Sequence, residues 1–234
     1  MDRKGLDAHI KRVTLALSVA ALTFVNTAQA NLVTNGSFET GAFVGDGLMS
    51  LNPGSAAIAG WTVFSGEILW EDNLLFTNYG VSASEGTKFL DLTGHDTVPY
   101  GGVEQTIATT PGLRYVVDFD FGTNPARYGG TQRVTAAAAA AASVFEFTGT
   151  GDTQQYQHYS LPFTATSAST LISFVGSGPA GGVHAGLDNV VVMIAVPEPS
   201  SAAMLAIGMI GLLTASCWRR VWSKPVAGRD RTPL

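Results

Sequence analysis

The chain has 234 residues, enough for one ordinary domain with short appendages, and only 13% of them are Asp, Glu, Lys or Arg. Its single cysteine excludes an intramolecular disulfide framework and a multi-cysteine metal cluster. Between residues 31 and 196, four basic residues stand against 14 carboxylates, and this net charge of −10 argues against nucleic-acid binding. The remaining basic residues lie near the two ends of the chain, which therefore need a separate explanation.

Residues 1–30 have the organisation of a cleavable secretory signal peptide. A basic stretch ends at Arg12, and an uncharged, mostly apolar run follows from Val13 to Val25. This run of 13 residues is too short to cross a bilayer core, which takes about 20 residues. Ala28 and Ala30 form the A-x-A site that signal peptidase recognises, so we expect cleavage after Ala30. A buried N-terminal helix is the alternative.

Residues 31–195 carry the pattern of β-strands. In residues 115–121, apolar side chains alternate with Asp118 and Asp120, as in a strand with one buried and one solvent-exposed face. Further strands are expected at 61–64, 67–70, 88–92, 103–107, 145–147, 156–163, 172–174 and 187–194. Turn residues separate them and no long amphipathic helix occurs, so we predict an all-β fold, an antiparallel β-sandwich of the jelly-roll type. The run Ala136–Ala142 interrupts the pattern and is interpreted as a low-complexity insertion or a poorly packed strand.

The usual motifs of an enzyme are missing. Neither a G-x-S-x-G elbow nor an H-E-x-x-H zinc motif occurs. Three histidines are far apart in sequence and are expected at the surface or in loops: His95, His158 and His184. Asp118 and Asp120 lie about 7 Å apart on one strand face, which is a glycosidase-like spacing, but such pairs flank a cleft from different elements. A solvated strand face is the favoured interpretation, and we predict a non-catalytic domain.

Sugar binding needs exposed aromatic faces with polar groups beside them. The foremost candidates are Trp70, Tyr79 and Tyr100, and Tyr128 and Tyr156 are further ones. For each single ring, core packing is the favoured interpretation, and this holds for Trp61 as well.

The C-terminal region has three parts in order. A Val196-Pro197-Glu198-Pro199 segment precedes an uncharged run, residues 200–218, and then the pair Arg219 and Arg220. The run of 19 residues, at ~1.5 Å each, reaches ~28 Å and predicts a single transmembrane helix. The positive-inside tendency places the basic tail, residues 221–234, in the cytoplasm and the upstream domain outside. A core helix of a soluble domain is the alternative, and it leaves the arginine pair unexplained.

This arrangement over residues 196–220 resembles the PEP-CTERM sorting signal of Gram-negative bacteria. The resemblance implies an inner-membrane intermediate whose C-terminal signal is cleaved by a membrane-embedded exosortase, after signal peptidase has removed the N-terminal one. It also implies delivery to the cell surface, the outer envelope or the extracellular polysaccharide matrix of a biofilm.

The 31–195 domain resembles galactose-binding-like jelly rolls, a group that includes many carbohydrate-binding modules. The likeness lies in the Asn31–Glu39 segment, the Gly60-Trp61 strand and the terminal Leu187–Val190 strand. It implies a structural calcium ion where the first and last strands meet, with Glu39 and Asp188 as ligands. Backbone carbonyls and water would have to complete such a shell. The alternative is that both carboxylates cap turns and face water.

The function expected from the whole chain is that of an exported, non-catalytic surface or matrix protein that binds polysaccharide. A secreted hydrolase acting on extracellular polysaccharide is one alternative, and a cleft holding two facing carboxylates from separate strands would favour it. A purely structural surface protein with no ligand is the other.

Overall fold

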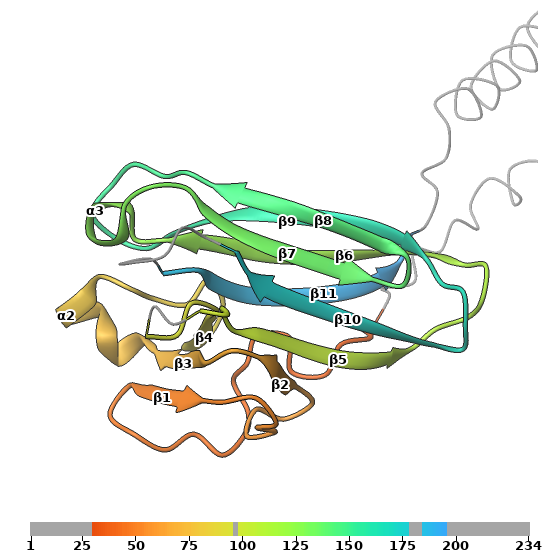
Figure 1. The fold of residues 1–234 in the computed structure, drawn as a ribbon, viewed down its shortest axis with the longest axis horizontal. Coiled ribbons are helices and arrows are strands. Elements are labelled where there is room, and N and C mark those ends of the chain that lie inside the picture. The colour runs from red at the N-terminus through yellow and green to blue at the C-terminus, as the bar shows by residue number, and fades with distance from the viewer. Residues whose placement is uncertain (1–29, 96–97, 178–183, 196–234) are drawn as a thin grey trace, which may run out of the picture. The chain divides into compact units, whose positions relative to one another are not determined.

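The fold is seen in a computed structural model that describes residues 30–95, 98–177 and 184–195. Its strands form two sheets stacked on one another (Figure 1). The six-stranded sheet has the order β1-β3-β4-β11-β6-β9, and the five-stranded sheet has the order β2-β5-β10-β7-β8. Every pair of neighbouring strands is antiparallel, so the predicted antiparallel β-sandwich is confirmed.

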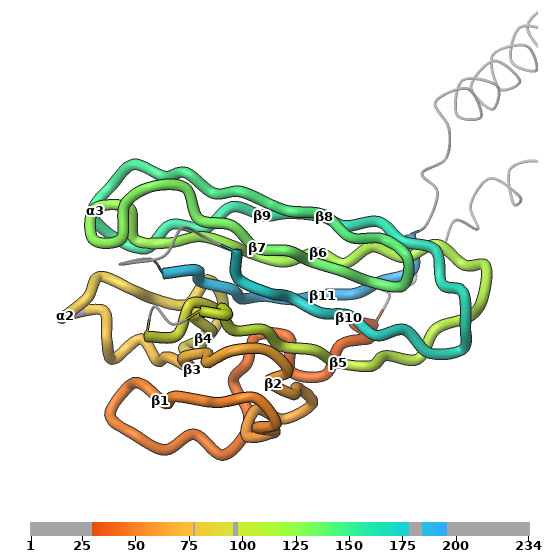
Figure 2. The backbone as a smooth tube through the Cα atoms, in the orientation of Figure 1, coloured from red at the N-terminus to blue at the C-terminus, as the bar shows by residue number. Residues whose placement is uncertain are grey.

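The six-stranded sheet consists of β1 (Leu48–Leu51), β3 (Ile68–Asp72), β4 (Lys88–Asp91), β11 (Gly186–Ile194), β6 (Arg114–Thr123) and β9 (Gln155–Thr164). The five-stranded sheet consists of β2 (Thr62–Ser65), β5 (Gly102–Ala108), β10 (Ser169–Gly176), β7 (Gln132–Ala138) and β8 (Ala141–Phe147). Three short helices lie in the connections: η1 (Asn73–Leu75), α2 (Phe76–Tyr79) and α3 (Pro125–Tyr128). Figure 2 shows that the connections carrying α2 and α3 reach the same end of the sandwich.

Strand β6 shows how alternation sets the two faces of the six-stranded sheet. Val117 and Phe119 are buried in the core between the sheets, whereas Asp118 and Asp120 point to the opposite, outer face. Trp61 is also part of this core, as expected, with 2% of its surface exposed. The period of two in residues 115–121 therefore predicted the side-chain directions correctly.

The alanine run forms a hairpin of two paired strands, so its interpretation as an insertion was wrong. Its β7 half is packed in the core, whereas Ala139, Ala140 and Ala142 are exposed, which agrees with a poorly packed strand on the β8 side. Strand β7 ends at Ala138, Ala139 takes a positive φ of 53° in the turn, and β8 begins at Ala141. Ala136 is fully buried and lies opposite Phe174 of β10. A small side chain beside a large ring keeps the layer closely packed, and this tertiary pairing overrides the helix propensity of alanine.

The N-terminal segment of the domain docks on the last strand. The Asn31 side chain donates to the Val190 carbonyl (3.2 Å) and accepts from the Val192 N–H (2.9 Å). A Cβ added to Gly36 would lie 1.9 Å from the Val190 carbonyl oxygen, so this close approach requires glycine. The expected meeting of the first and last segments is therefore present.

A second, smaller apolar cluster lies outside the main core. Leu75, Val81 and Phe89 are buried together, with Tyr128 packed against them. Phe89 precedes the core residue Leu90 in β4, so it points to the outer face of the six-stranded sheet. The η1–α2 connection thus covers part of that face, near the end where α3 lies.

No helix of the described residues is long and apolar enough to cross a membrane. The expected signal-peptide core and the expected transmembrane run, residues 200–218, fall outside these residues.

Candidate functional site

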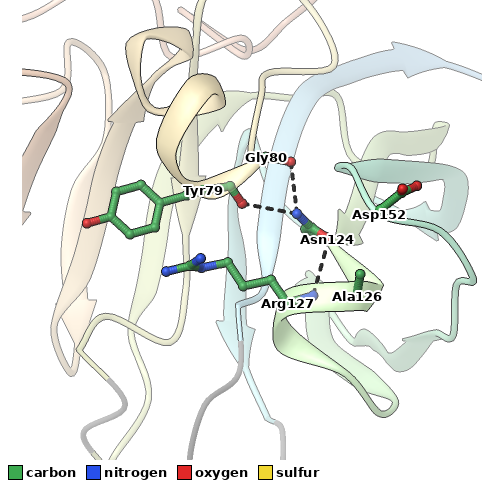
Figure 3. A pocket seen from close by; sticks show the side chains of 6 residues that line it. All are labelled: Tyr79, Gly80, Asn124, Ala126, Arg127 and Asp152. Atoms are coloured by element: carbon green, nitrogen blue, oxygen red, sulfur yellow. Dashed lines mark hydrogen bonds between the residues drawn. The ribbon is translucent and has the colours of Figure 1, made fainter.

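The described residues form an open pocket of about 350 Å³ at the end of the sandwich that carries α2 and α3 (Figure 3). Its walls come from the end of α2, from the start of α3 and from the β8–β9 connection. The lining residues are Tyr79, Gly80, Asn124, Ala126, Arg127 and Asp152. The fold therefore brings together three segments that are distant in the sequence.

Asn124 holds the pocket together. Its Oδ1 accepts from the Arg127 N–H (3.4 Å) at the start of α3, as an N-cap residue does. Its Nδ2 donates to the carbonyls of Tyr79 (3.0 Å) and Gly80 (3.1 Å). Gly80 ends α2 in the left-handed conformation, and a Cβ there would lie 2.5 Å from Asn124 Nδ2. One side chain thus fixes the end of α2 against the start of α3.

Arg127 and Tyr79 form the chemically distinctive part of the pocket. The Arg127 guanidinium lies over the Tyr79 ring, 4.5 Å from its centroid, and Tyr79 is 40% exposed. The guanidinium is also 5.7 Å from the Tyr128 ring, and Arg127 Nε donates to the Tyr128 hydroxyl (3.3 Å). These contacts stack a planar cation on one face of an aromatic ring at the surface.

Within the described part of the chain, Arg127, like Arg114, differs from the other two basic residues of this acidic domain in having no ion pair. Lys88 pairs with Asp72 (3.1 Å), and Arg133 pairs with Glu146 (2.6 Å). Among the described residues, no carboxylate lies within ion-pair distance of Arg127. Its remaining N–H donors can therefore serve a ligand.

Beneath Tyr128 lies a buried polar cluster. The Tyr128 ring stacks on the His184 imidazole, with centroids 5.0 Å apart and an interplanar angle of 21°. His184 Nε2 lies 3.4 Å from Glu71 Oε2, and Asp91 completes a group whose ligand atoms lie within 4.8 Å of one another. All three residues are less than 5% exposed. We call Glu71, Asp91 and His184 the buried triad.

The charges of the buried triad strongly affect one another. Burial by itself lowers the pKa of His184, but the Asp91 and Glu71 carboxylates beside it raise that pKa to about 9. Burial raises the pKa of Asp91, against the opposing effect of His184.

His184 lies in the loop before β11, which agrees with the expected loop position, but it is buried rather than at the surface. The His95 and His158 side chains are both 59% exposed, as expected of surface residues. Glu71, Asp91 and His184 have no sequence spacing that relates them. They meet because β4 pairs with both β3 and β11, so only the strand order could have revealed the buried triad.

Asp118 and Asp120 lie on the outer face of β6 and do not line the pocket. Asp120 Oδ1 contacts His158 Nδ1 (2.9 Å), and Asp120 Oδ2 accepts from Asn189 Nδ2 (3.1 Å). Asp118 accepts from the Ser160 hydroxyl. These contacts agree with the interpretation of a polar strand face, and they do not place the two carboxylates across a cleft.

Glu39 and Asp188 bind two neighbouring parts of the connection between α2 and β4. Glu39 Oε1 accepts from the N–H groups of Thr87 and Lys88, both at 2.7 Å. Asp188 Oδ2 accepts from the N–H groups of Ser84 (2.7 Å) and Glu85 (2.8 Å). Asp188 is fully buried, and burial raises its pKa to about 7 although backbone N–H groups oppose the shift. The calcium ion stays a prediction to which these contacts add no support, because N–H donors point at both carboxylates.

Two of the aromatic candidates need correction. Trp70 is fully buried and donates from Nε1 to the Phe38 carbonyl (3.0 Å), and Tyr100 is 7% exposed. Neither ring has a face on which a sugar could stack. Tyr79 lines the pocket, whereas Tyr156 donates its hydroxyl to the Ser82 carbonyl (2.9 Å). Trp70 belongs to the core between the sheets, so its burial does not depend on what covers the outer face.

Residues 195–220 match the PEP-CTERM protein-sorting motif, which confirms the sorting signal and marks the chain as an exported protein. The motif residues themselves lie outside the described part: Val196, Pro197, Glu198, Pro199, Arg219 and Arg220. Ala28 of the expected cleavage site also lies outside it, and Ala30 is exposed at its first position.

Similar solved structures include several carbohydrate-binding modules. A family 35 carbohydrate-binding module from Clostridium thermocellum is 13% identical, with a TM-score of 0.43 over 63% of this chain and 99% of that one. The module TmCBM61, in complex with β-1,4-galactotriose, is 14% identical, with a TM-score of 0.40 over 71% and 99%. A structure titled "CBM4 structure and function" is 14% identical, with a TM-score of 0.39 over 70% and 99%.

No curated protein matches the chain. Residues 31–190 match the family described as "Protein of unknown function (DUF642)", and this match covers most of the chain. The protein is therefore a member of the DUF642 family that carries a PEP-CTERM sorting motif.

Proposed function

We propose that this exported protein is non-catalytic and binds polysaccharide through the pocket between α2 and α3. The pairing of the 40% exposed Tyr79 ring with the Arg127 guanidinium supports this most strongly. A sugar ring packs its C–H face on an aromatic ring, while its hydroxyl groups need hydrogen-bond donors and acceptors. Arg127 supplies donors beside the ring, and Asp152 lines the pocket on the other side of Asn124 (Figure 3).

The form of the pocket indicates which part of a polysaccharide it would hold. Its volume of about 350 Å³ is near the lower end of the range typical of ligand sites, about 300–1,000 Å³. This volume suits a chain end or a branch rather than a long stretch of polymer. Because Asn124 fixes the surrounding backbone, little ordering should be needed on binding.

A glycan array with the full-length chain, purified in detergent, tests this proposal, followed by calorimetric titration of the best ligand. We expect Tyr79→Ala and Arg127→Ala each to weaken binding at least tenfold. Phe76→Ala is the matched control, because Phe76 belongs to the same helix, is 48% exposed and does not line the pocket. Unchanged binding by Tyr79→Ala and Arg127→Ala would contradict the proposal. If no glycan on the array binds the wild-type chain, the result favours a structural protein without a ligand.

A secreted hydrolase is the rival from another class. Glu71 and Asp91 do face one another from separate strands, but they are buried, and Asp152 is the one carboxylate among the residues that line the pocket. A hydrolytic pair instead has to reach a bond of the substrate from both sides. Release of reducing sugar from the glycan that binds best would support the hydrolase and refute the non-catalytic role.

We further propose that an exosortase processes the PEP-CTERM motif and that the mature protein resides at the cell surface or in an extracellular polysaccharide matrix. The motif at residues 195–220 supports the processing step. Mass spectrometry of the mature C-terminus tests it, because cleavage near the motif should remove the apolar run and the arginine pair. An intact C-terminus in the surface fraction would refute it.

A further inference from the structure

Separate from the pocket lining, the buried triad brings three metal-ligating side chains together. Oxygen atoms of Glu71 and Asp91 and a ring nitrogen of His184 lie within 4.8 Å of one another. The contact between Glu71 Oε2 and His184 Nε2, at 3.4 Å, is close to the separation of two ligands around one small ion. A metal–ligand distance of about 2.0–2.2 Å leads to such separations in tetrahedral geometry.

One ligand oxygen is already held in place. Asp91 Oδ1 accepts from the Thr93 N–H (2.9 Å), the Thr93 hydroxyl (2.7 Å) and the Ala185 N–H (2.9 Å). Three donors on one oxygen orient the carboxylate and leave its other oxygen free of these bonds. Hydrogen bonds of this kind orient metal ligands in proteins.

The buried triad is also shielded from solvent, since all three residues are less than 5% exposed. Burying groups that can carry charge is costly unless they pair with one another or coordinate a metal ion.

One ring nitrogen of the buried triad is also unpartnered. His184 Nδ1 is buried and has no hydrogen-bond partner among the described residues. A buried polar atom without a partner destabilises the fold, so this nitrogen is available to bind an ion.

From these four observations we propose that Glu71, Asp91 and His184 bind a divalent transition-metal ion of the zinc type. One imidazole and two carboxylates suit such an ion, whereas calcium prefers a shell made of oxygen alone. Three protein ligands leave a further position for water. The site shares no residue with the expected calcium pair, Glu39 and Asp188, and it does not depend on the proposed polysaccharide binding.

The test is a calorimetric titration of the metal-stripped, full-length chain in detergent with Zn²⁺, and with Mn²⁺ and Ca²⁺ in parallel. We expect one Zn²⁺ per chain and much weaker Ca²⁺ binding. Glu71→Gln and His184→Asn should each weaken Zn²⁺ binding at least tenfold. His158→Asn is the matched control, because His158 lies on the outer face of the same sheet beside two carboxylates but is exposed. This variant should bind Zn²⁺ as the wild type does.

The proposal is overturned if the wild-type chain binds no Zn²⁺, if binding is lost in His158→Asn, or if both triad variants bind like the wild type. Should the triad variants fail to fold, imidazole NMR of the wild-type chain decides the matter. The chain has four histidines, and the variants His9→Asn, His95→Asn and His158→Asn assign three of the ring signals, so the fourth belongs to His184. Zn²⁺ must then shift the ring signals of His184, and a shift confined to the other histidines overturns the proposal.

Discussion

Asp188 provides the sharpest test of the energetics, because its carboxylate is fully buried and still accepts backbone N–H bonds. Burial raises its pKa from 3.8 to about 7. Between these values the folded protein binds the proton more tightly than the unfolded chain does, so stability falls as pH rises. At ~1.4 kcal/mol per pKa unit, ionised Asp188 costs the folded state about 4 kcal/mol by the upper end of this window.

The Asp188→Asn variant removes the ionisation and keeps the shape. Its side-chain oxygen can still accept from the N–H groups of Ser84 and Glu85. Near pH 4 we expect the variant and the wild-type protein to have similar stability, because both carry a neutral side chain. Near pH 7.5 we expect the variant to be more stable by up to about 4 kcal/mol.

The assay is urea unfolding of the 31–195 domain from pH 4 to 8, followed by the fluorescence of the buried Trp61 and Trp70. The decisive quantity is the difference in unfolding free energy between variant and wild type at each pH, since other carboxylates affect both proteins alike. Asp46→Asn removes an exposed carboxylate and controls for the change in net charge. A difference that does not change with pH would refute the argument from burial.

Three further substitutions test the core packing, the turn after α2 and an exposed ion pair. Trp70→Ala should lower the unfolding free energy, measured by urea titration, by about 3–5 kcal/mol, because the buried indole fills the core. A loss below about 1 kcal/mol would contradict the core position of Trp70. Gly80→Ala puts a side chain on a left-handed residue, with the added Cβ 2.5 Å from Asn124 Nδ2. It should destabilise the domain by about 1–3 kcal/mol and weaken glycan binding. An unchanged thermal unfolding temperature would argue against this contact. Glu146→Ala breaks the exposed ion pair with Arg133. Because solvent screens such a pair, the unfolding free energy should change by less than about 1 kcal/mol. A larger loss in the same urea assay would show that solvent does not screen the pair.

Local patterns predicted the strands well and individual sites poorly. The alternation around Asp118 and Asp120 predicted both faces of β6, because side-chain direction in a strand follows from residue parity alone. The same parity places Trp70 in the core, but exposure of the outer face depends on what covers it. Tyr79 is accessible because it ends a short helix at the end of the sandwich, and no periodic pattern predicted that helix.

The sequence alone determined the C-terminal sorting signal and the β character of the domain, because these depend on neighbouring residues: an apolar run followed by an arginine pair, or alternation along a strand. Tertiary structure decided the pocket, the hairpin in the alanine run and the buried triad. Glu71, Asp91 and His184 meet through the pairing of β3, β4 and β11, and Asn124 reaches α2 across more than 40 residues of chain. Such contacts depend on strand order and register, which local chemistry does not encode residue by residue.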